Sequence, residues 1–233
     1  MTTGGMALVR LRSVTSPDFS LEHEARDSFA APIAGVDEAG RGPLAGPVVA
    51  AAVILDEHHC PAGLNDSKAL SEAQRERLFV ELQVSAIIGI GIVDVAQIDQ
   101  LNILQATLLA MREAVAALDV SPTIALVDGN RAPILDCHVR TVIKGDSRSL
   151  SIAAASVIAK VTRDRTMREL AERHPGYGWQ RNMGYGTPEH KAALARLGAT
   201  PHHRRSFAPV RAALGIAGDP SPTSRGKVNT KGR

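Results

Sequence analysis

The amino-acid sequence predicts an α/β protein with a mixed β-sheet flanked by helices and a small helical part near its C-terminal end. Two observations carry this prediction. Short runs rich in Val, Ile and Ala recur between residues 33 and 143, as expected for buried strands. The first two runs are joined by a tight Gly/Pro turn, whereas the later runs are separated by helical patterns. Tight turns connect antiparallel strands and helical crossovers connect parallel ones, so the sheet should contain both.

Local signals mark each element of the first half. The predicted strands of this half lie at residues 33–39, 48–55 and 86–93. Ser71 and Gln74 have the spacing of a capping box, which predicts a helix that begins there and reaches about Val84. A possible short helix lies earlier, within residues 21–28.

The second half continues the alternation of strands and helices. Asp94 and Gln97 have the spacing of an N-cap and its third helical residue, and residues 98–118 are interpreted as one helix. Thr187 caps a further helix, with Pro188 at its favoured first position. The remaining predictions are strands at 123–127 and 138–143, and helices at 150–173 and 187–197.

Composition is that of an ordinary globular protein. The 233 residues are 44% hydrophobic and 22% charged, with a net charge of +3, which is compatible with a nucleic-acid partner but does not identify one. Cys60 and Cys137 are too few for a disulfide framework and lack metal-ligand spacing. No segment has the roughly 18 apolar residues of a membrane span. We therefore expect a soluble cytoplasmic protein that does not bind membranes and is a monomer.

The chain is expected to form one domain between two flexible ends. Residues 1–31 are interpreted as a flexible leader and residues 32–212 as the α/β domain with its C-terminal helical part. Residues 213–233 are interpreted as a disordered basic tail, in which only Ile216 and Val228 could contribute to a core. A solvated tail and a nucleic-acid contact both remain open for this segment.

Four acidic residues share one context. Asp37, Glu38, Asp128 and Asp146 each lie in or at the end of a predicted strand, beside glycine or another acid. Strand ends in such a sheet can converge on one crevice, where the carboxylates would repel one another unless cations lay among them. Oxygen-only ligands favour Mg²⁺ or Mn²⁺, and two such ions would support hydrolysis of a phosphodiester.

Simpler roles remain open for each acid taken singly. Asp128 precedes Gly129 and could belong to an ordinary turn, and Asp146 could cap the next helix. Asp37 and Glu38 are harder to explain by structure alone, because burial and mutual repulsion both disfavour adjacent carboxylates in an apolar strand. The four together are more specific than any one of them.

The motifs around these acids resemble those of type 2 ribonuclease H, ribonuclease HII, over residues 32–209. In chain order they are GVDEAGRGPLAGPV, LNDSKALS, LVDGN, KGD, SIAAASVIAKVTRDR and GYGTPEH. The resemblance implies a ribonuclease H-like fold and cleavage of RNA paired with DNA. It also implies incision 5′ to single ribonucleotides in duplex DNA, as in ribonucleotide excision repair, which leaves 3′-hydroxyl and 5′-phosphate ends.

The same resemblance implies roles for particular residues. Asp37, Glu38, Asp128 and Asp146 match the family's four metal-binding acids. The backbone of Gly40, Arg41 and Gly42 is implied to contact the ribose 2′-hydroxyl, which glycine permits because it lacks a Cβ. Arg41 is expected either to contact phosphate or to form an ion pair with one of the acids. Tyr185 matches the tyrosine that stacks on the deoxyribose after the ribonucleotide.

Four further residues are candidates for phosphate contacts: Lys68, Ser151, Lys160 and Arg163. Lys160 and Arg163 share a helix face, although a solvated face or a surface pair between Lys160 and Asp164 remains open. His202 to Arg205 are interpreted as a basic surface loop, and Trp179 as a residue of either the core or the site. Ala153, Ala154, Ala155 and Ala159 are expected to let their helix pack closely on the sheet.

Two other functions remain open from the sequence. A different nuclease or strand-transfer enzyme could use clustered acids on the same kind of sheet, although the Gly40–Gly42 element and Tyr185 argue against it. A non-catalytic binder of RNA–DNA hybrids is the second alternative, although such a binder would not require all four acids.

Overall fold

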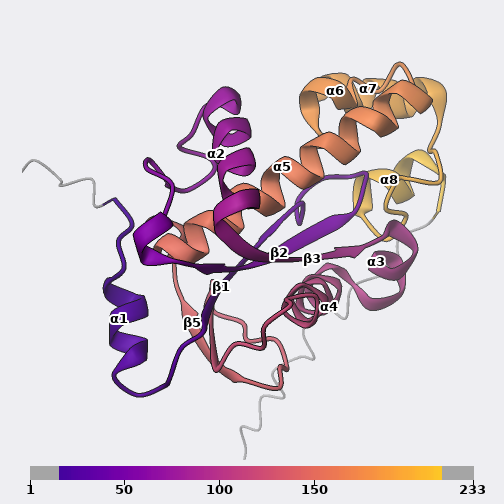
Figure 1. The fold of residues 1–233 in the computed structure, drawn as a ribbon. Coiled ribbons are helices and arrows are strands. Elements are labelled where there is room, and N and C mark those ends of the chain that lie inside the picture. The colour runs from indigo at the N-terminus through magenta and orange to yellow at the C-terminus, as the bar shows by residue number, and fades with distance from the viewer. Residues whose placement is uncertain (1–15, 217–233) are drawn as a thin grey trace, which may run out of the picture.

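The structure, a computed structural model, describes residues 16–216 (Figure 1). Its five-stranded sheet has the order β3-β2-β1-β4-β5. The strands are β1 (Ile33–Ala39), β2 (Val48–Leu55), β3 (Ala86–Val93), β4 (Ile124–Asp128) and β5 (His138–Val142). β1, β2 and β3 pair in antiparallel fashion, whereas β4 is parallel to both β1 and β5. The predicted mixed sheet is therefore confirmed, with each strand within one residue of its expected bounds.

Helices cover both faces of the sheet, as Figure 1 shows. On one face lie α5 (Leu150–Arg173) and α2 (Glu72–Ser85), and on the other lies α4 (Ile103–Ala116). The four alanines of α5 that were expected to allow close packing are fully buried against β2 and α2: Ala153, Ala154, Ala155 and Ala159. Among the described residues, no helix is long and apolar enough to cross a membrane.

The C-terminal helical part packs at the C-terminal end of α5 (Figure 1). It contains α6 (Trp179–Asn182), α7 (Pro188–Leu197) and α8 (Ala208–Ala213). Trp179 has no exposed surface and stacks on Tyr177 with ring centroids 5.1 Å apart. Of the two roles open for Trp179, the structure supports core packing.

The predicted helix over residues 98–118 is interrupted, and this part of the prediction is wrong. The segment forms α3 (Val95–Leu101) and then α4, with Asn102 between them at a positive φ of 68°. The Asn102 side chain accepts hydrogen bonds from the amides of Leu104 and Gln105, so it caps the second helix. With ψ at 162° this conformation is unfavourable for any residue that has a Cβ, and the two capping hydrogen bonds help to offset its cost.

The short helix expected within residues 21–28 is confirmed, but the prediction that the leader is flexible is wrong here, because this helix is docked on the domain. α1 (Ser20–Arg26) buries Leu21, Glu22 and Ala25 against the domain. The Oε1 atom of Glu22 accepts hydrogen bonds from the hydroxyls of Ser149 and Ser151 and from the Ser151 amide. A hydrogen-bonded carboxylate and an apolar face hold this segment in place. Residues 1–15 and 217–233, which include most of the predicted tail, lie outside the described residues.

Candidate active site

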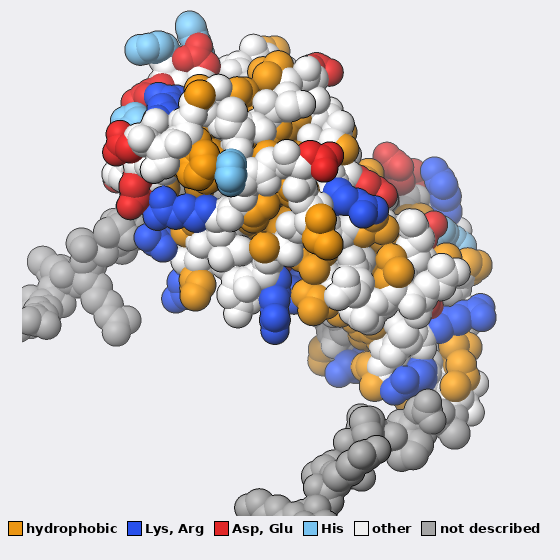
Figure 2. Space-filling model, turned by 90° about the horizontal axis from the view of Figure 1, so that it is seen from below, with side chains coloured by type: hydrophobic (Ala, Val, Ile, Leu, Met, Phe, Trp, Pro, Cys, Tyr) orange, Lys and Arg blue, Asp and Glu red, His pale blue; other side chains and the backbone are white. Residues whose placement is uncertain are grey.

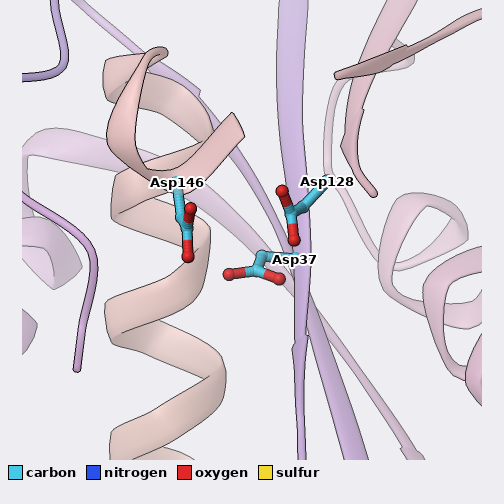
Figure 3. Close-up of side chains that lie close together, drawn as sticks. All are labelled: Asp37, Asp128 and Asp146. Carbon is cyan, nitrogen blue, oxygen red and sulfur yellow. The ribbon is translucent and has the colours of Figure 1, made fainter. Parts of the chain in front are cut away.

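Three carboxylates from different elements meet at one edge of the sheet. Asp37 comes from β1, Asp128 from the end of β4, and Asp146 from the short 3₁₀ turn η2 (Gly145–Ser147) that follows β5. One oxygen of each lies within 4.8 Å of the others, and Figure 3 shows the side chains pointing toward one another. Because β1 and β4 are parallel neighbours, their carboxyl ends reach the same edge.

Backbone amides hold two of these carboxylates. The amide of Glu38 donates to Oδ1 of Asp37 at 2.7 Å, and the amide of Gly145 donates to Oδ1 of Asp128 at 2.7 Å. Asp146 does not cap α5, because Ser149 is the N-cap and accepts from the Ile152 amide. The capping alternative for Asp146 is therefore excluded.

The carboxylates are held where negative charge is unfavourable. Burial, together with repulsion from Glu38 and Asp128, raises the pKa of Asp37 well above its ordinary value. Burial also raises the pKa of Asp146, and Asp66 and Asp128 add to the effect. Charges placed so close together in a buried site favour a bound cation.

The donor atoms fit a hard divalent ion. The three clustered ligand atoms are all carboxylate oxygens, the type that Mg²⁺ and Mn²⁺ prefer. The Nζ atom of Lys68 lies 3.4 Å from Asp146 and 3.5 Å from Asp66, on the exposed side of the cluster. Burial alone would lower the pKa of the Lys68 ammonium group. The net shift is upward, because the ammonium is attracted to Asp66, Asp146 and Asp37.

Glu38 lies beside the cluster and pairs with Arg41. Arg41 Nη1 is 3.2 Å from Glu38 Oε1, so the structure shows the ion pair that was one of two roles considered for Arg41. Burial raises the pKa of Glu38, although the Arg41 guanidinium opposes this rise. Half of the Arg41 side chain is exposed, which leaves it free to exchange partners.

A cavity of about 360 Å³ joins the acids to the other predicted motifs. It is lined by Asp37, Glu38, Gly40, Arg41, Gly42, Lys68, Asp128, Lys160, Arg163 and Tyr185, among others. Of the predicted site residues only Asp146, which lies in the carboxylate cluster, and Ser151 are not in its lining. Tyr185 is 46% exposed, so its ring is accessible from solvent.

Basic residues on the α4 side of the molecule do not identify a binding site. On the α4 side of the molecule, Lys and Arg side chains are scattered among apolar and uncharged ones and do not gather in one patch (Figure 2). Surface charge on this face therefore marks no binding site, and the cavity indicates where a substrate would bind.

All four residues predicted to contact phosphate have protein partners, and two of them are buried. Ser151 is 1% exposed and its hydroxyl donates to Glu22, so its interpretation as a phosphate contact is wrong. Arg163 is also 1% exposed, and its guanidinium donates to the carbonyls of Pro47, Ala45 and Met183. Lys160 pairs with Asp164 at 2.7 Å and still lines the cavity, but the pair expected at the surface is largely buried, because the Asp164 side chain is only 7% exposed.

The interpretation of residues 202–205 as a basic surface loop is wrong for its two central members. His203 and Arg204 have no exposed surface. Their sequence neighbourhood is polar, and only contacts with distant segments bury them, so no local pattern could have revealed this. Thr200 donates its amide to Nδ1 of His203, at 2.9 Å.

His190 connects this buried region to Tyr185. Its Nδ1 atom lies 2.9 Å from the Tyr185 carbonyl oxygen and must donate to it. Its Nε2 atom accepts from Trp179 and lies 3.1 Å from Nε2 of His203. Because Nε2 of His190 accepts from Trp179 and Nδ1 of His203 accepts from the Thr200 amide, each ring keeps one unprotonated nitrogen and both imidazoles are neutral.

This neutral histidine pair predicts a loss of stability in acid. Burial, with His190, His202 and His174, lowers the pKa of His203 to about 4. Unfolded histidine takes up a proton below about pH 6.5, so the unfolded state binds more protons between pH 6.5 and 4. The contribution of neutral His203 to the free energy of unfolding is fully present above pH 6.5. It is lost as the pH falls toward 4, which lowers the free energy of unfolding by about 1–3 kcal/mol.

The measurement is the melting temperature of the metal-free protein and of His203→Gln between pH 7.5 and 5. The buried carboxylates have raised pKa values, so their protonation increases stability as the pH falls. Both proteins contain them, and comparing the two proteins at each pH removes this effect. We expect the variant to be less stable at pH 7.5 and to lose less stability on acidification. Parallel curves for the two proteins would contradict the assignment.

Comparison with known proteins supports the resemblance given by the motifs. Residues 34–210 match the family model described as ribonuclease HII. A ribonuclease HII of Parvibaculum lavamentivorans is 61% identical over 199 residues, which cover 85% of this chain and 74% of that protein. A ribonuclease HII of Ruegeria pomeroyi is 57% identical, with 87% of each chain covered.

Solved structures give the same result for the fold. The crystal structure of ribonuclease H2 from Pyrococcus horikoshii OT3 has a TM-score of 0.68 and 29% sequence identity to this chain. The match covers 78% of this chain and 97% of that one. The family match over residues 34–210 includes the carboxylate cluster, nearly all of the sheet and most of the C-terminal helical part.

Proposed function

The chain belongs to the ribonuclease HII family, and from that premise we propose that it incises duplex DNA 5′ to a single embedded ribonucleotide. It is a hydrolase of the type 2 ribonuclease H class with a ribonuclease H-like fold, and we also propose hydrolysis of the RNA strand of RNA–DNA hybrids. Both reactions would leave 3′-hydroxyl and 5′-phosphate ends. The observation that supports the proposal best is the meeting of the carboxylates, the Gly40–Gly42 loop and Tyr185 around one cavity.

The chain's own residues would hold the metal and keep the carboxylates oriented. Asp37, Asp128 and Asp146 would be the ligands, and Glu38 would join them if Arg41 paired with phosphate instead. Two divalent ions bound there would supply an activated water and stabilise the leaving oxygen. The amides of Glu38 and Gly145 each fix one oxygen of a ligand carboxylate before metal binds. Such support restricts the ligand rotamers and favours a preformed site.

The other side of the cavity would distinguish RNA from DNA. The Gly40–Gly42 backbone lines the cavity beside the acids, where it could donate hydrogen bonds to a ribose 2′-hydroxyl. Lys160 and Arg41 lie on the same lining and carry positive charge suited to backbone phosphates. Tyr185 would contact the next sugar along the strand.

One cleavage assay tests this function against its alternatives. The substrates are a DNA duplex with one ribonucleotide, the matching all-DNA duplex and a continuous RNA–DNA hybrid, each with Mg²⁺ or Mn²⁺. We expect products only from the two ribonucleotide-containing substrates, with the cut 5′ to the lone ribonucleotide. Cleavage of the all-DNA duplex would indicate another nuclease, and binding without products would indicate a hybrid-binding protein.

Tyr185→Ala should weaken cleavage of the duplex with one ribonucleotide by about 5- to 150-fold, because an aromatic stacking contact contributes ~1–3 kcal/mol. The loss should be smaller on the continuous hybrid, where the following sugar carries a 2′-hydroxyl that fits the ring less well. Tyr185→Phe is the control and should retain most activity, since stacking needs only the ring. The measurement is kcat/KM of both variants on both substrates. Equal losses would leave Tyr185 with a general supporting role.

A further inference from the structure

Arg204 is a buried cation whose partners are the backbone of the loop that lines the cavity. Its Nε donates to the Gly46 carbonyl at 3.0 Å, and its Nη1 donates to the Arg41 carbonyl at 3.0 Å. Its Nη2 donates to the carbonyls of Gly40 at 2.5 Å and Pro47 at 3.1 Å. Four carbonyls of one short loop therefore converge on a single guanidinium.

A second buried guanidinium extends this arrangement to the Tyr185 segment. Arg163 donates to the carbonyl of Pro47, which also accepts from Arg204. It donates as well to the carbonyls of Ala45 and Met183. Neither guanidinium has a carboxylate within salt-bridge distance among residues 16–216. Burying a cation without a counterion is unfavourable, so the backbone carbonyls must supply the compensating negative charge. Burial and the neighbouring Arg163 lower the pKa of Arg204 to about 9.

The peptide geometry links these bonds to the face that a substrate would meet. In a planar trans peptide the C=O and the following N–H point in opposite directions. Because the Gly40 and Arg41 carbonyls point to Arg204, the amides of Arg41 and Gly42 point away from it. Gly40, Arg41 and Gly42 line the cavity, whereas Arg204 lies behind them. Within the described part of the chain, neither amide donates to a protein acceptor.

We propose that Arg204 is a positioning residue for substrate recognition: it turns the Arg41 and Gly42 amides toward the cavity and presets them for a ribose 2′-hydroxyl. Arg163 fixes the same loop relative to the Tyr185 segment, so the Gly40–Gly42 backbone and Tyr185 are held in one fixed arrangement. This inference rests on the proposed function, because it assumes that the loop reads the 2′-hydroxyl. The residue is not in contact with substrate and acts only through the backbone that it holds.

The test is binding rather than cleavage. The probes are a DNA duplex with one ribonucleotide and the all-DNA duplex of the same sequence, titrated in Ca²⁺ after a check that both duplexes stay intact. Two amide hydrogen bonds predict that the wild-type protein prefers the ribonucleotide duplex by about 5- to 150-fold. In Arg204→Lys, which keeps the charge but cannot reach four carbonyls, the preference should fall below about 3-fold, since the amides are no longer oriented. The affinity for the all-DNA duplex should be unchanged.

Two further variants control for folding. Arg205→Lys changes the exposed neighbour, whose main-chain amide bonds to Asp99, and should keep the full preference. Arg204→Gln provides a second substitution in case Arg204→Lys is unstable, and each protein is titrated at a temperature where circular dichroism shows it folded. A folded Arg204 variant with the wild-type preference would overturn the proposal. A wild-type protein without any preference would instead overturn the reading of the 2′-hydroxyl by this loop, and with it that part of the proposed function.

Discussion

Asp37→Asn should abolish cleavage while making the metal-free protein more stable. The substitution removes a proposed metal ligand, and activity should fall by more than roughly 100-fold, because even loss of an outer-shell partner costs 10- to 100-fold. The Asp37 carboxylate is 4% exposed, and its pKa is raised by burial and by Glu38 and Asp128. Burial and repulsion therefore make the charged form of Asp37 unfavourable in the folded state. Replacing it with a neutral amide should gain about 1–2 kcal/mol, or about 2–8 °C in melting temperature.

The measurement combines turnover with melting curves in the presence and absence of Mg²⁺. The ion should stabilise the wild-type protein by binding to its folded state, and this shift should be much smaller in Asp37→Asn. Asp56→Asn is the matched control, because Asp56 is exposed, lies outside the site and has a pKa lowered by hydrogen bonds from His59 and His58. It should keep full activity and gain no stability. An active Asp37→Asn would remove Asp37 from the metal site.

Gly42→Ala should impair cleavage without destabilising the protein. A Cβ added at Gly42 would have only the Tyr185 ring within reach, at 3.5 Å, which is ordinary contact. The methyl group would instead occupy the face on which a ribose must approach the backbone. We expect kcat/KM on the single-ribonucleotide duplex to fall on the order of 100-fold, as displacements of about 1 Å can cause. The melting temperature should change by no more than about 2 °C.

The neighbouring glycine provides a contrasting control. Gly40 has a φ of +100°, and its Cβ would lie 2.1 Å from Nε of Arg163 and 2.8 Å from the Pro47 carbonyl oxygen. Gly40→Ala should therefore destabilise the fold by about 2–5 kcal/mol, through backbone strain and overpacking. If Gly42→Ala retained wild-type kcat/KM, the close approach of a sugar to this loop would be disproved.

The sequence predicts the sheet and the acids well because their signals are local. β-branched runs, the capping box at Ser71 and the glycines after Asp37 and Asp128 each depend on a few neighbouring residues. The convergence of Asp37, Asp128 and Asp146 also follows from the parallel pairing of strands that carry or precede them. Family resemblance then adds the loop and Tyr185, which no periodic pattern could have marked.

The features that the sequence did not predict depend on contacts between distant segments. His203 and Arg204 lie in a polar stretch, yet bonds to the loop before β2 bury them. Glu22 was expected in a flexible leader, and its partners are serines at the start of α5. In each case the side chain is charged or polar, and its burial becomes favourable only when the other segment supplies hydrogen bonds.

The bonds from Arg204 to the Gly40–Pro47 loop also bear on the order of events during synthesis. A ribosome delivers the chain from its N-terminus, and β1, β4 and all three clustered carboxylates emerge before Arg204 does. The loop carbonyls of Gly40 and Arg41 gain their partner only when a segment more than 160 positions later has folded back onto them. Bringing such distant segments together costs more loop-closure entropy than forming local contacts does. A nascent chain would thus carry all three clustered acids before the residue that orients the proposed recognition loop, and the proposed selectivity would be the last property acquired.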